Sequence, residues 1–302
     1  MAARPTRNDM TTPTERPILV TGANGMLAGA LRRRFGQPGG PAAPVIWTDV
    51  DELNIGDEAA VRQLVERRRC GAIINCAGLT QVDECQSRRD EAMRINGAAV
   101  GHLARAAEAV GAVLVQISTD FVFGGDGARP YVEADPPQPL NAYGESKLLG
   151  EREAARVPEH LIVRTAWLYG PHGRNFVRSI CRQAALGRPL TVVNDQVGCP
   201  TYTGDLAEAI VRLMGCGSRG VVHACGSEPT SWFEFAREIV RLRQSDVAVE
   251  PISSRRLGRP ARRPAMSVLD CSRLAELTGY RLPGFRTSLP AYLAEMTSGE
   301  DG

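Results

Sequence analysis

The stretch ILVTGANGMLA at residues 18–28 joins a short apolar run to a turn with two glycines and an amphipathic segment. Such a run predicts a buried strand, and the segment after it predicts a helix. Gly22 would permit a tight turn, and Gly25 would let the backbone approach a pyrophosphate at the helix N-terminus. Ala28 stands where a third glycine would fall, and its side chain is small enough for helix–strand packing. The motif predicts a dinucleotide-binding turn, although a plain strand–turn–helix junction can share its spacing.

Apolar runs alternate with amphipathic stretches after this turn. The predicted strands are 18–21, 45–48, 72–77, 113–118 and 161–165, and the predicted helices are 26–35, 58–68, 91–110 and 143–155. Alternating strands and helices indicate a parallel sheet with helices on both faces. We therefore expect an α/β fold of the Rossmann type, with a doubly wound parallel sheet.

The regular alternation of predicted strands and helices ends after Thr165. We expect helices at 175–186 and 206–214, and strands at 190–193 and 220–224. Ser231 and Glu234 have capping-box spacing, which predicts a helix running to about Leu242. The Arg/Pro-rich stretch 251–264 should be irregular. These features predict a dinucleotide-binding domain of residues 17–165 plus about 190–225, and a smaller C-terminal substrate-binding region of about 166–189 and 226–302.

Composition sets outer limits on function. The 302 residues carry a net charge of +2, and aromatic residues do not interleave with basic ones, so we expect no nucleic-acid partner. Residues 1–16 are polar and read as a disordered leader, not a signal peptide. The sequence contains no run of about 18 apolar residues, so we expect no membrane-spanning helix. The eight cysteines form no C-x-x-C pair, which favours reduced thiols and a cytoplasmic location.

Asp49 ends the second predicted strand, 27 residues after Gly22. A carboxylate at this place can accept hydrogen bonds from a ribose and would repel a 2′-phosphate, which favours NADH over NADPH. Asp49 could instead be a solvated strand-end residue. Arg32, Arg33 and Arg34 could attract a 2′-phosphate, but we expect them to face water.

Tyr143 and Lys147 are four residues apart, so they share one face of a predicted helix. A phenol is a poor acid at neutral pH, and a nearby ammonium favours its ionised form and lowers its pKa. Such a phenol can protonate a carbonyl oxygen during reduction. Thr119, at the end of the strand before this helix, could bond the same oxygen. The spacing also arises by chance, but here it follows a glycine turn and a strand ending in Ser-Thr.

Together these motifs resemble the extended short-chain dehydrogenase/reductase superfamily. Within it the chain is similar to the dTDP-4-dehydrorhamnose reductase family from Ile18 onward. The matching stretches are VTGANGMLAGAL, INCAGLTQVDECQ, INGAAVGHLARAA, ISTDFVF, PLNAYGESKLLGE, IVRTAWLYG, NFV, VVNDQVGCPTYTGDLA and RRPAMSVLD. The resemblance implies an NAD(P)H-dependent oxidoreductase that reduces the C4 ketone of a nucleotide-activated 4-keto-6-deoxyhexose.

The resemblance also implies roles for individual residues. The catalytic residues would be Thr119, Tyr143 and Lys147. The cofactor would contact Gly22, Asn24, Gly25, Met26, Leu27, Asp49, Asn54, Ile55, Ala77, Gly78, Thr80, Tyr143 and Lys147. The nucleotide sugar would contact Thr80, Thr119, Asp120, Trp167, Gln196, Pro200 and Arg263. Asn54 replaces an aspartate of the family. Arg263 is the one residue of a basic tail that we expect to grip a diphosphate.

One further departure from the family and two alternative functions complete the prediction. Some family members use a glutamate in the first helix for a magnesium-bridged dimer, but Ala30 occupies that position, so we expect no metal and leave a homodimer open. An epimerase or dehydratase of the superfamily is one alternative, although dehydratases carry an acidic pair where Asp120 is followed by Phe121. A non-catalytic subunit resembling the regulator of methionine adenosyltransferase is the other.

Overall fold

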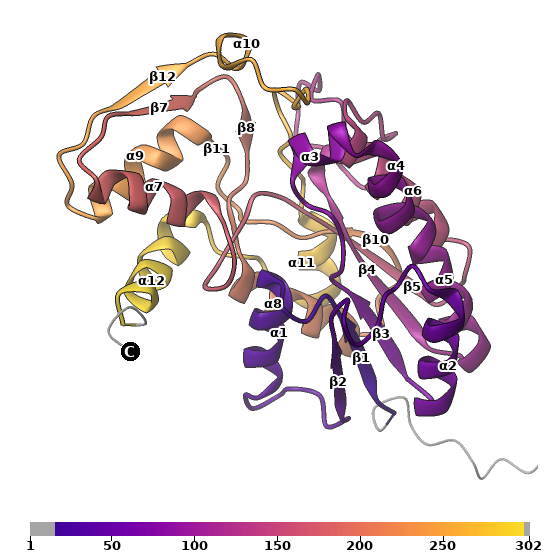
Figure 1. Cartoon of the computed structure of the whole chain (residues 1–302). Helices are drawn as coiled ribbons and strands as arrows, with labels where there is room; N and C mark the ends of the chain where they lie inside the picture. Colours follow the sequence, from indigo (N-terminus) through magenta and orange to yellow (C-terminus); the bar gives the residue numbers. More distant parts are fainter. Residues whose placement is uncertain (1–15, 299–302) are drawn as a thin grey trace, which may run out of the picture.

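Six parallel strands form the central sheet, in the order β10-β5-β4-β3-β1-β2 (Figure 1). The computed structural model describes residues 16–298, so the predicted leader lies outside the described residues except for Arg16. The strands are β1 (Ile18–Thr21), β2 (Val45–Thr48), β3 (Ala72–Asn75), β4 (Val113–Thr119), β5 (His160–Thr165) and β10 (Gly220–His223). β1, β3 and most of β4 are buried, and their residues are mainly apolar, as expected for a parallel sheet covered on both faces.

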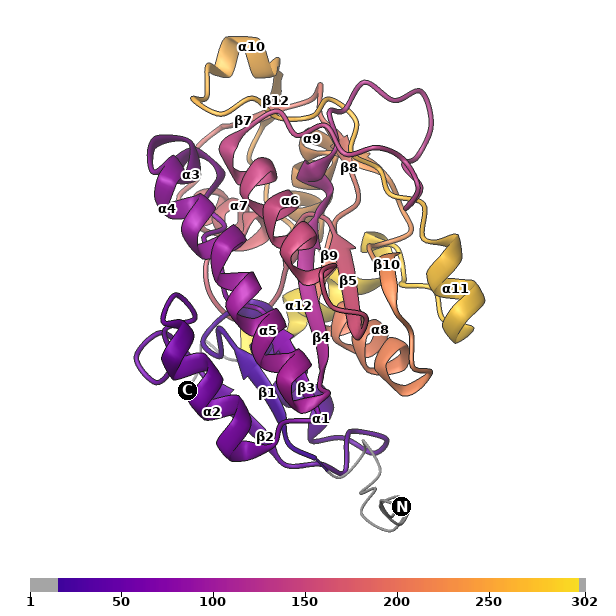
Figure 2. The same cartoon turned by 90° about the vertical axis from the view of Figure 1, so that its right-hand side faces the viewer.

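Helices cover both faces of the sheet, so the predicted doubly wound α/β fold is confirmed (Figure 2). Apolar side chains on the two faces of β1 separate cleanly, with Val20 in one cluster and Leu19 in the other. One face carries α1 (Met26–Phe35), α8 (Thr203–Gly215) and α11 (Ser272–Thr278). The other carries α2 (Glu58–Arg68), α5 (Ala99–Val110) and α6 (Ala142–Ala154).

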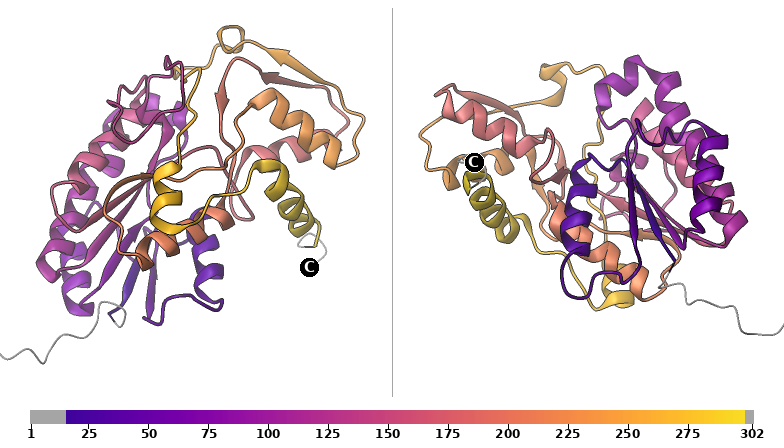
Figure 3. Two further views of the ribbon diagram at one scale, coloured as in Figure 1. Left: turned by 180° about the vertical axis from the view of Figure 1, so that it is seen from behind. Right: turned by 60° about the horizontal axis from the view of Figure 1, so that its bottom comes forward.

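A smaller region with its own apolar cluster stands beside the sheet (Figure 3). It contains α7 (Phe176–Ala185), β7 (Leu190–Val193), α9 (Trp232–Leu242), β12 (Val249–Ile252) and α12 (Phe285–Ser298). β7 pairs with β12 and not with the central sheet, which differs from our placement of residues 190–193 in the dinucleotide-binding domain. Ser231 accepts a hydrogen bond from the Glu234 N–H, so the predicted cap of α9 is confirmed.

Short elements connect these layers. They are α3 (Val82–Ser87), α4 (Arg89–Ala92), the π-helix η1 (Met93–Ala98), the 3₁₀ turn η2 (Asp120–Val122), β6 (Leu168–Tyr169), β8 (Val197–Gly198), β9 (Thr201–Tyr202), β11 (Thr230–Ser231) and α10 (Ser254–Leu257). The single helix predicted for 91–110 is therefore interrupted by a π-helical turn. The stretch 251–264 contains the end of β12 and all of α10, so the prediction of an irregular tail was wrong there.

No helix within residues 16–298 combines the length and apolar character needed to cross a bilayer. The carboxyl ends of β1, β3, β4 and β5 meet at one edge of the sheet, beneath the smaller region (Figure 1). In open α/β sheets ligands bind at this edge. The fold therefore directs attention to the space between the sheet edge and the smaller region.

Candidate active site

A cleft of about 1430 Å³ occupies this space. Of the predicted site residues, the cleft is lined by Asn24, Gly25, Met26, Leu27, Ala77, Gly78, Thr80, Thr119, Asp120, Tyr143, Lys147, Trp167, Gln196 and Arg263. Gly22, Asp49, Asn54, Ile55 and Pro200 do not line it. Segments from both halves of the chain thus converge on one concave site, the form expected for a small-molecule pocket.

The glycine turn forms one end of the cleft. Gly22 has φ +67°, and a Cβ there would lie 2.7 Å from the Ala77 nitrogen, so the turn requires glycine. Gly25 is the N-cap of α1, and no side chain caps the helix. The uncapped N–H groups and the helix dipole suit an anionic diphosphate. The turn therefore has the chemistry that a dinucleotide needs.

The Asp49 side chain stabilises the glycine turn through hydrogen bonds to the backbone. One carboxylate oxygen accepts the Asn24 N–H at 2.8 Å, and the other accepts the Val50 N–H at 2.8 Å. Arg32 lies over the Trp47 ring, while Arg33 pairs with Glu295 and Arg34 pairs with Glu208. Arg32 and Arg33 are exposed, as expected, although each also contacts another part of the protein, whereas Arg34 is half-buried against Glu208.

Tyr143, Lys147 and Thr119 meet at the floor of the cleft. The Asn141 side chain accepts the Gly144 N–H at 2.9 Å and so caps the helix α6 that carries Tyr143 and Lys147. The Lys147 ammonium donates to the Ile117 carbonyl at 2.6 Å, and burial lowers its pKa to about 8. Lys147 is therefore a cation at neutral pH and can release its proton a little above it.

The phenol of Tyr143 behaves differently from our expectation. Burial raises its pKa, the Asp120 carboxylate raises it further, and a hydrogen bond with Thr119 acts in the opposite direction. The Lys147 ammonium donates to the Ile117 carbonyl and not to the phenol, and burial has the largest influence on the Tyr143 pKa. The phenol is consequently protonated at neutral pH. It is an available proton donor in a water-poor position, with the Phe121 ring edge-on at 5.7 Å.

Asp120 is buried beside the same floor, with 1% of its surface exposed. One of its carboxylate oxygens accepts the Thr119 hydroxyl at 3.1 Å. The other has no hydrogen-bond partner among residues 16–298. Burial raises the pKa of Asp120 to about 6, although the nearby Ser267 and Thr119 hydroxyls act in the opposite direction. An unsatisfied buried oxygen next to the cleft is suited to a hydroxyl donor of a ligand.

Asn96 supports this floor and was missed in the sequence. It lies in the π-helix η1, exchanges hydrogen bonds with the backbone of Leu79 at 2.8 and 2.9 Å, and donates to the Ser146 hydroxyl at 3.0 Å. Ser146 in turn donates to the Tyr143 carbonyl at 2.7 Å. Asn96 therefore joins the strand-end loop next to Gly78 to the start of α6. A π-turn often marks a functional position, but its presence could not be read from residue spacing.

Two stacked indoles form the opposite wall. Trp167 and Trp232 lie with ring centroids 3.5 Å apart and an angle of 5° between their planes. Trp167 adopts φ +46°, a strained conformation for a bulky residue. A Cβ at Gly198 would lie 2.6 Å from Trp167 Nε1, so the indole depends on the absence of a side chain there. Trp232 lines the cleft as well.

Arg263 closes one side of the cleft through protein contacts. Its guanidinium donates to both carboxylate oxygens of Asp83, at 3.1 and 2.9 Å. Asp83 also accepts the Ala261 N–H at 3.1 Å. Asp83 thus fastens the C-terminal arm to α3, and Arg263, which we expected to grip a diphosphate, lines the cleft while paired with Asp83. Within residues 16–298, the side chains of Arg174, Arg255 and Arg262 line the cleft without an ion pair or hydrogen bond.

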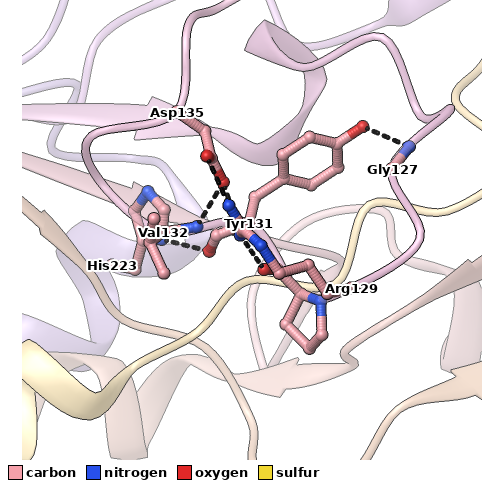
Figure 4. Close-up of polar contacts among 7 residues, drawn as sticks. Gly127, Arg129, Tyr131, Val132, Asp135 and His223 are labelled. Atoms are coloured by element: carbon pink, nitrogen blue, oxygen red, sulfur yellow. Dashed lines mark hydrogen bonds and ion pairs between the residues drawn. The ribbon is translucent and has the colours of Figure 1, made fainter.

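Figure 4 shows how the connection between β4 and α6 is held in place. The Tyr131 hydroxyl accepts the Gly127 N–H at 3.0 Å, and Asp135 receives two hydrogen bonds from Arg129 at 2.8 and 2.9 Å. The His223 ring contacts the Tyr131 carbonyl at 3.1 Å. The loop is therefore anchored to the sheet, and α6 starts from a fixed position.

Comparisons with known proteins agree with this geometry. The model of the RmlD substrate binding domain family matches residues 16–298. A dTDP-4-dehydrorhamnose reductase of Streptomyces griseus is 45% identical over 86% of this chain and 88% of its own length.

Solved structures are equally similar. A dTDP-4-dehydrorhamnose reductase from Clostridium acetobutylicum shares 39% identity with a TM-score of 0.89, covering 93% of this chain and 99% of its own. One from Bacillus anthracis, solved in complex with NADP, shares 36% identity with a TM-score of 0.88 over 93% and 99% of the two chains. The chain therefore belongs to the RmlD substrate binding domain family, the dTDP-4-dehydrorhamnose reductase family that its motifs resemble.

Proposed function

We propose that the protein is an NAD(P)H-dependent oxidoreductase that reduces the C4 ketone of a nucleotide-activated 4-keto-6-deoxyhexose. The observation that carries this proposal is the convergence of Tyr143, Lys147 and Thr119 between the glycine turn and the indole wall. The names of the family members that it resembles support the substrate class.

The residues of the floor would divide the chemistry among them. A reduced nicotinamide, when bound, supplies a hydride to the ketone carbon. Tyr143, protonated because burial raises its pKa, would donate its proton to the developing alkoxide oxygen. Thr119 would hydrogen-bond the same oxygen, and the Lys147 ammonium would stabilise the phenolate left behind. Lys147 would also hold the ribose hydroxyls of the cofactor.

The remaining walls would bind the nucleotide sugar. The cations Arg174, Arg255 and Arg262 are suited to its diphosphate. The flat face of Trp167 is suited to packing against an apolar sugar or base surface. Trp167, Trp232 and the arm of residues 254–263 all fall within the predicted substrate-binding region of about 166–189 and 226–302.

Net oxidation of the cofactor tests the proposal. With a dTDP-4-keto-6-deoxyhexose, we expect one NADPH consumed for each hydroxyl sugar formed. Epimerases and dehydratases of the superfamily regenerate their cofactor, so product without net oxidation would favour that alternative. Absence of turnover on every nucleotide keto-sugar, with recovery of an adenosyltransferase in a stoichiometric complex, would favour the regulatory subunit.

The choice between NADH and NADPH depends in part on Asp49. The relative solved with NADP gives no support to our expectation of an NADH preference, and we propose that the cleft accepts NADPH. A unit charge a few ångströms from a phosphate costs about 1 kcal/mol in water. Because amide N–H groups already compensate the Asp49 carboxylate, Asp49→Asn should raise the NADPH/NADH ratio of kcat/KM by at most about five-fold.

Asp51→Asn provides the matched control, because Asp51 is an exposed carboxylate two residues farther along. Its ratio should equal that of the unmodified protein. A lower ratio in Asp49→Asn would show that Asp49 does not face the 2′-position.

Gly198→Ala tests the indole wall. The added methyl group overlaps the Trp167 ring and must displace it from Trp232. Loss of one aromatic contact is worth about 1 kcal/mol, so we expect KM for the nucleotide sugar to rise about five-fold or more. KM for NADPH should not change. Gly215→Ala is the control, since a Cβ at Gly215 meets nothing within 4 Å. Equal KM values in the two variants would remove Trp167 from the substrate site.

A further inference from the structure

Two cysteine sulfurs touch behind the indole wall. The Cys225 and Cys271 sulfurs lie 3.5 Å apart, and the Cys225 N–H points at the Cys271 sulfur at 3.4 Å. Cys225 follows β10, and Cys271 immediately precedes α11, so the contact joins segments 46 residues apart. Both thiols are free. The pair was not singled out by sequence spacing because its members are distant along the chain.

Backbone hydrogen bonds hold the segments that carry the two cysteines close together. Tyr131, at the centre of Figure 4, donates its N–H to the Val268 carbonyl and accepts the Asp270 N–H at its own carbonyl, both at 2.8 Å. The same carbonyl contacts the His223 ring, two residues before Cys225. Tyr131 therefore fixes the segments leading to both sulfurs, and their proximity is a property of the fold.

The two thiols differ in reactivity. Cys225 is 1% exposed, whereas Cys271 is only partly buried. Hydrogen bonds from the Cys225 thiol and N–H lower the pKa of Cys271, while burial and the Glu133 and Asp270 carboxylates oppose this effect. The thiolate is the form that attacks an oxidant. Cys271 is therefore the attacking sulfur, and Cys225 is placed to resolve the product.

We propose that Cys225 and Cys271 form a reversible disulfide when the protein meets a peroxide. The Cys271 thiolate breaks the O–O bond of hydrogen peroxide and takes one oxygen as a sulfenic acid, and the other leaves as water after gaining a proton. The Cys225 sulfur then displaces the sulfenic oxygen, which leaves as a second water with the Cys225 proton. Overall two thiols lose two hydrogens, one peroxide is reduced to two waters, and one S–S bond forms.

Formation of the disulfide would change the position of Trp167 in the cleft. A disulfide requires the sulfurs to approach to about 2.05 Å, which draws Cys225 toward Cys271. The next residue, Gly226, donates its N–H to the Thr201 hydroxyl at 3.0 Å. Thr201 in turn donates its N–H to the Trp167 carbonyl at 3.1 Å. The displacement is thereby passed to Trp167, so oxidation should raise KM for the nucleotide sugar; this consequence alone rests on the proposed function.

Peptide mapping of the full-length protein tests the bond without any assay of turnover. After brief treatment with hydrogen peroxide, we expect one linked peptide containing Cys225 and Cys271, about 2 Da lighter than the sum of the two thiol peptides. Dithiothreitol should separate it. Trp fluorescence should change on oxidation and recover on reduction, because Trp167 and Trp232 are stacked.

Two variants control the experiment. Cys216→Ser removes an exposed cysteine outside the pair and should leave the linked peptide intact. Cys271→Ser should abolish both the linked peptide and the reversible fluorescence change. The buried Cys199 thiol also contacts Cys225 and is the competing partner. Over-oxidised Cys271 without any linkage in the unmodified protein would overturn the proposal, and so would linkage of Cys225 to Cys199. Neither result depends on whether the protein reduces a keto-sugar.

Discussion

Tyr143→Phe is expected to lower kcat by about 10²–10⁴-fold, the usual contribution of a positioned general acid. The substitution removes only the hydroxyl and leaves the ring in contact with Phe121. The helix α6 keeps its Asn141 cap, and Lys147 keeps its hydrogen bond to the Ile117 carbonyl. Cofactor affinity should therefore stay close to that of the unmodified protein.

Stopped-flow turnover and fluorescence titration with NADPH would measure the two effects separately. Tyr280→Phe is the matched control, because the Tyr280 ring lies under Arg212, outside the residues that line the cleft. Its turnover should be unchanged. Turnover of Tyr143→Phe at the level of Tyr280→Phe would show that another group protonates the alkoxide.

Glu151→Ala is expected to lower the free energy of unfolding by about 3–5 kcal/mol, the effect of leaving a buried charge without its partner. Glu151 lies on α6 one turn after Lys147, and it accepts two hydrogen bonds from Arg164, at 2.9 and 2.7 Å. It also accepts the Ser118 hydroxyl at 2.5 Å. The side chains of this pair are only 4% and 5% exposed, so solvent cannot replace the lost contact.

Urea unfolding followed by circular dichroism measures this loss. Arg237→Ala, which breaks the exposed pair with Glu234, should cost about 0–1 kcal/mol. In the double variant Glu151→Leu/Arg164→Met both charges are gone, and much of the stability should return. A single variant Glu151→Ala as stable as Arg237→Ala would show that the buried pair does not hold α6 against β4 and β5.

Local patterns in the sequence predicted the features that depend on neighbouring residues. The G-x-x-G turn and the Tyr143–Lys147 pair each follow from spacing along one element, and both line the cleft. The alternating strands and helices predicted the sheet for the same reason. The start of α9 was also predicted correctly, because the spacing of Ser231 and Glu234 is a local capping signal.

Features that depend on distant partners could not be predicted. Arg263 binds Asp83 across 180 residues, and no pattern near either residue indicates this pairing. The strand β7 looked like a return to the sheet, but its partner is β12. The Tyr143 pKa depends on burial beneath segments from several elements, so the expected effect of Lys147 was overestimated. These differences concern the contacts that hold the site together; the predicted location of the site is unchanged.

Transfer of deuterium from the cofactor tests the central claim most directly. NADPH deuterated at C4 of the nicotinamide would be incubated with the protein and a dTDP-4-keto-6-deoxyhexose, and the product examined by NMR. We predict one deuterium bonded to C4 of the hexose and an equal amount of oxidised cofactor, with both signals lost in Tyr143→Phe. Product that lacks deuterium at C4, formed while the cofactor remains reduced, would contradict the account.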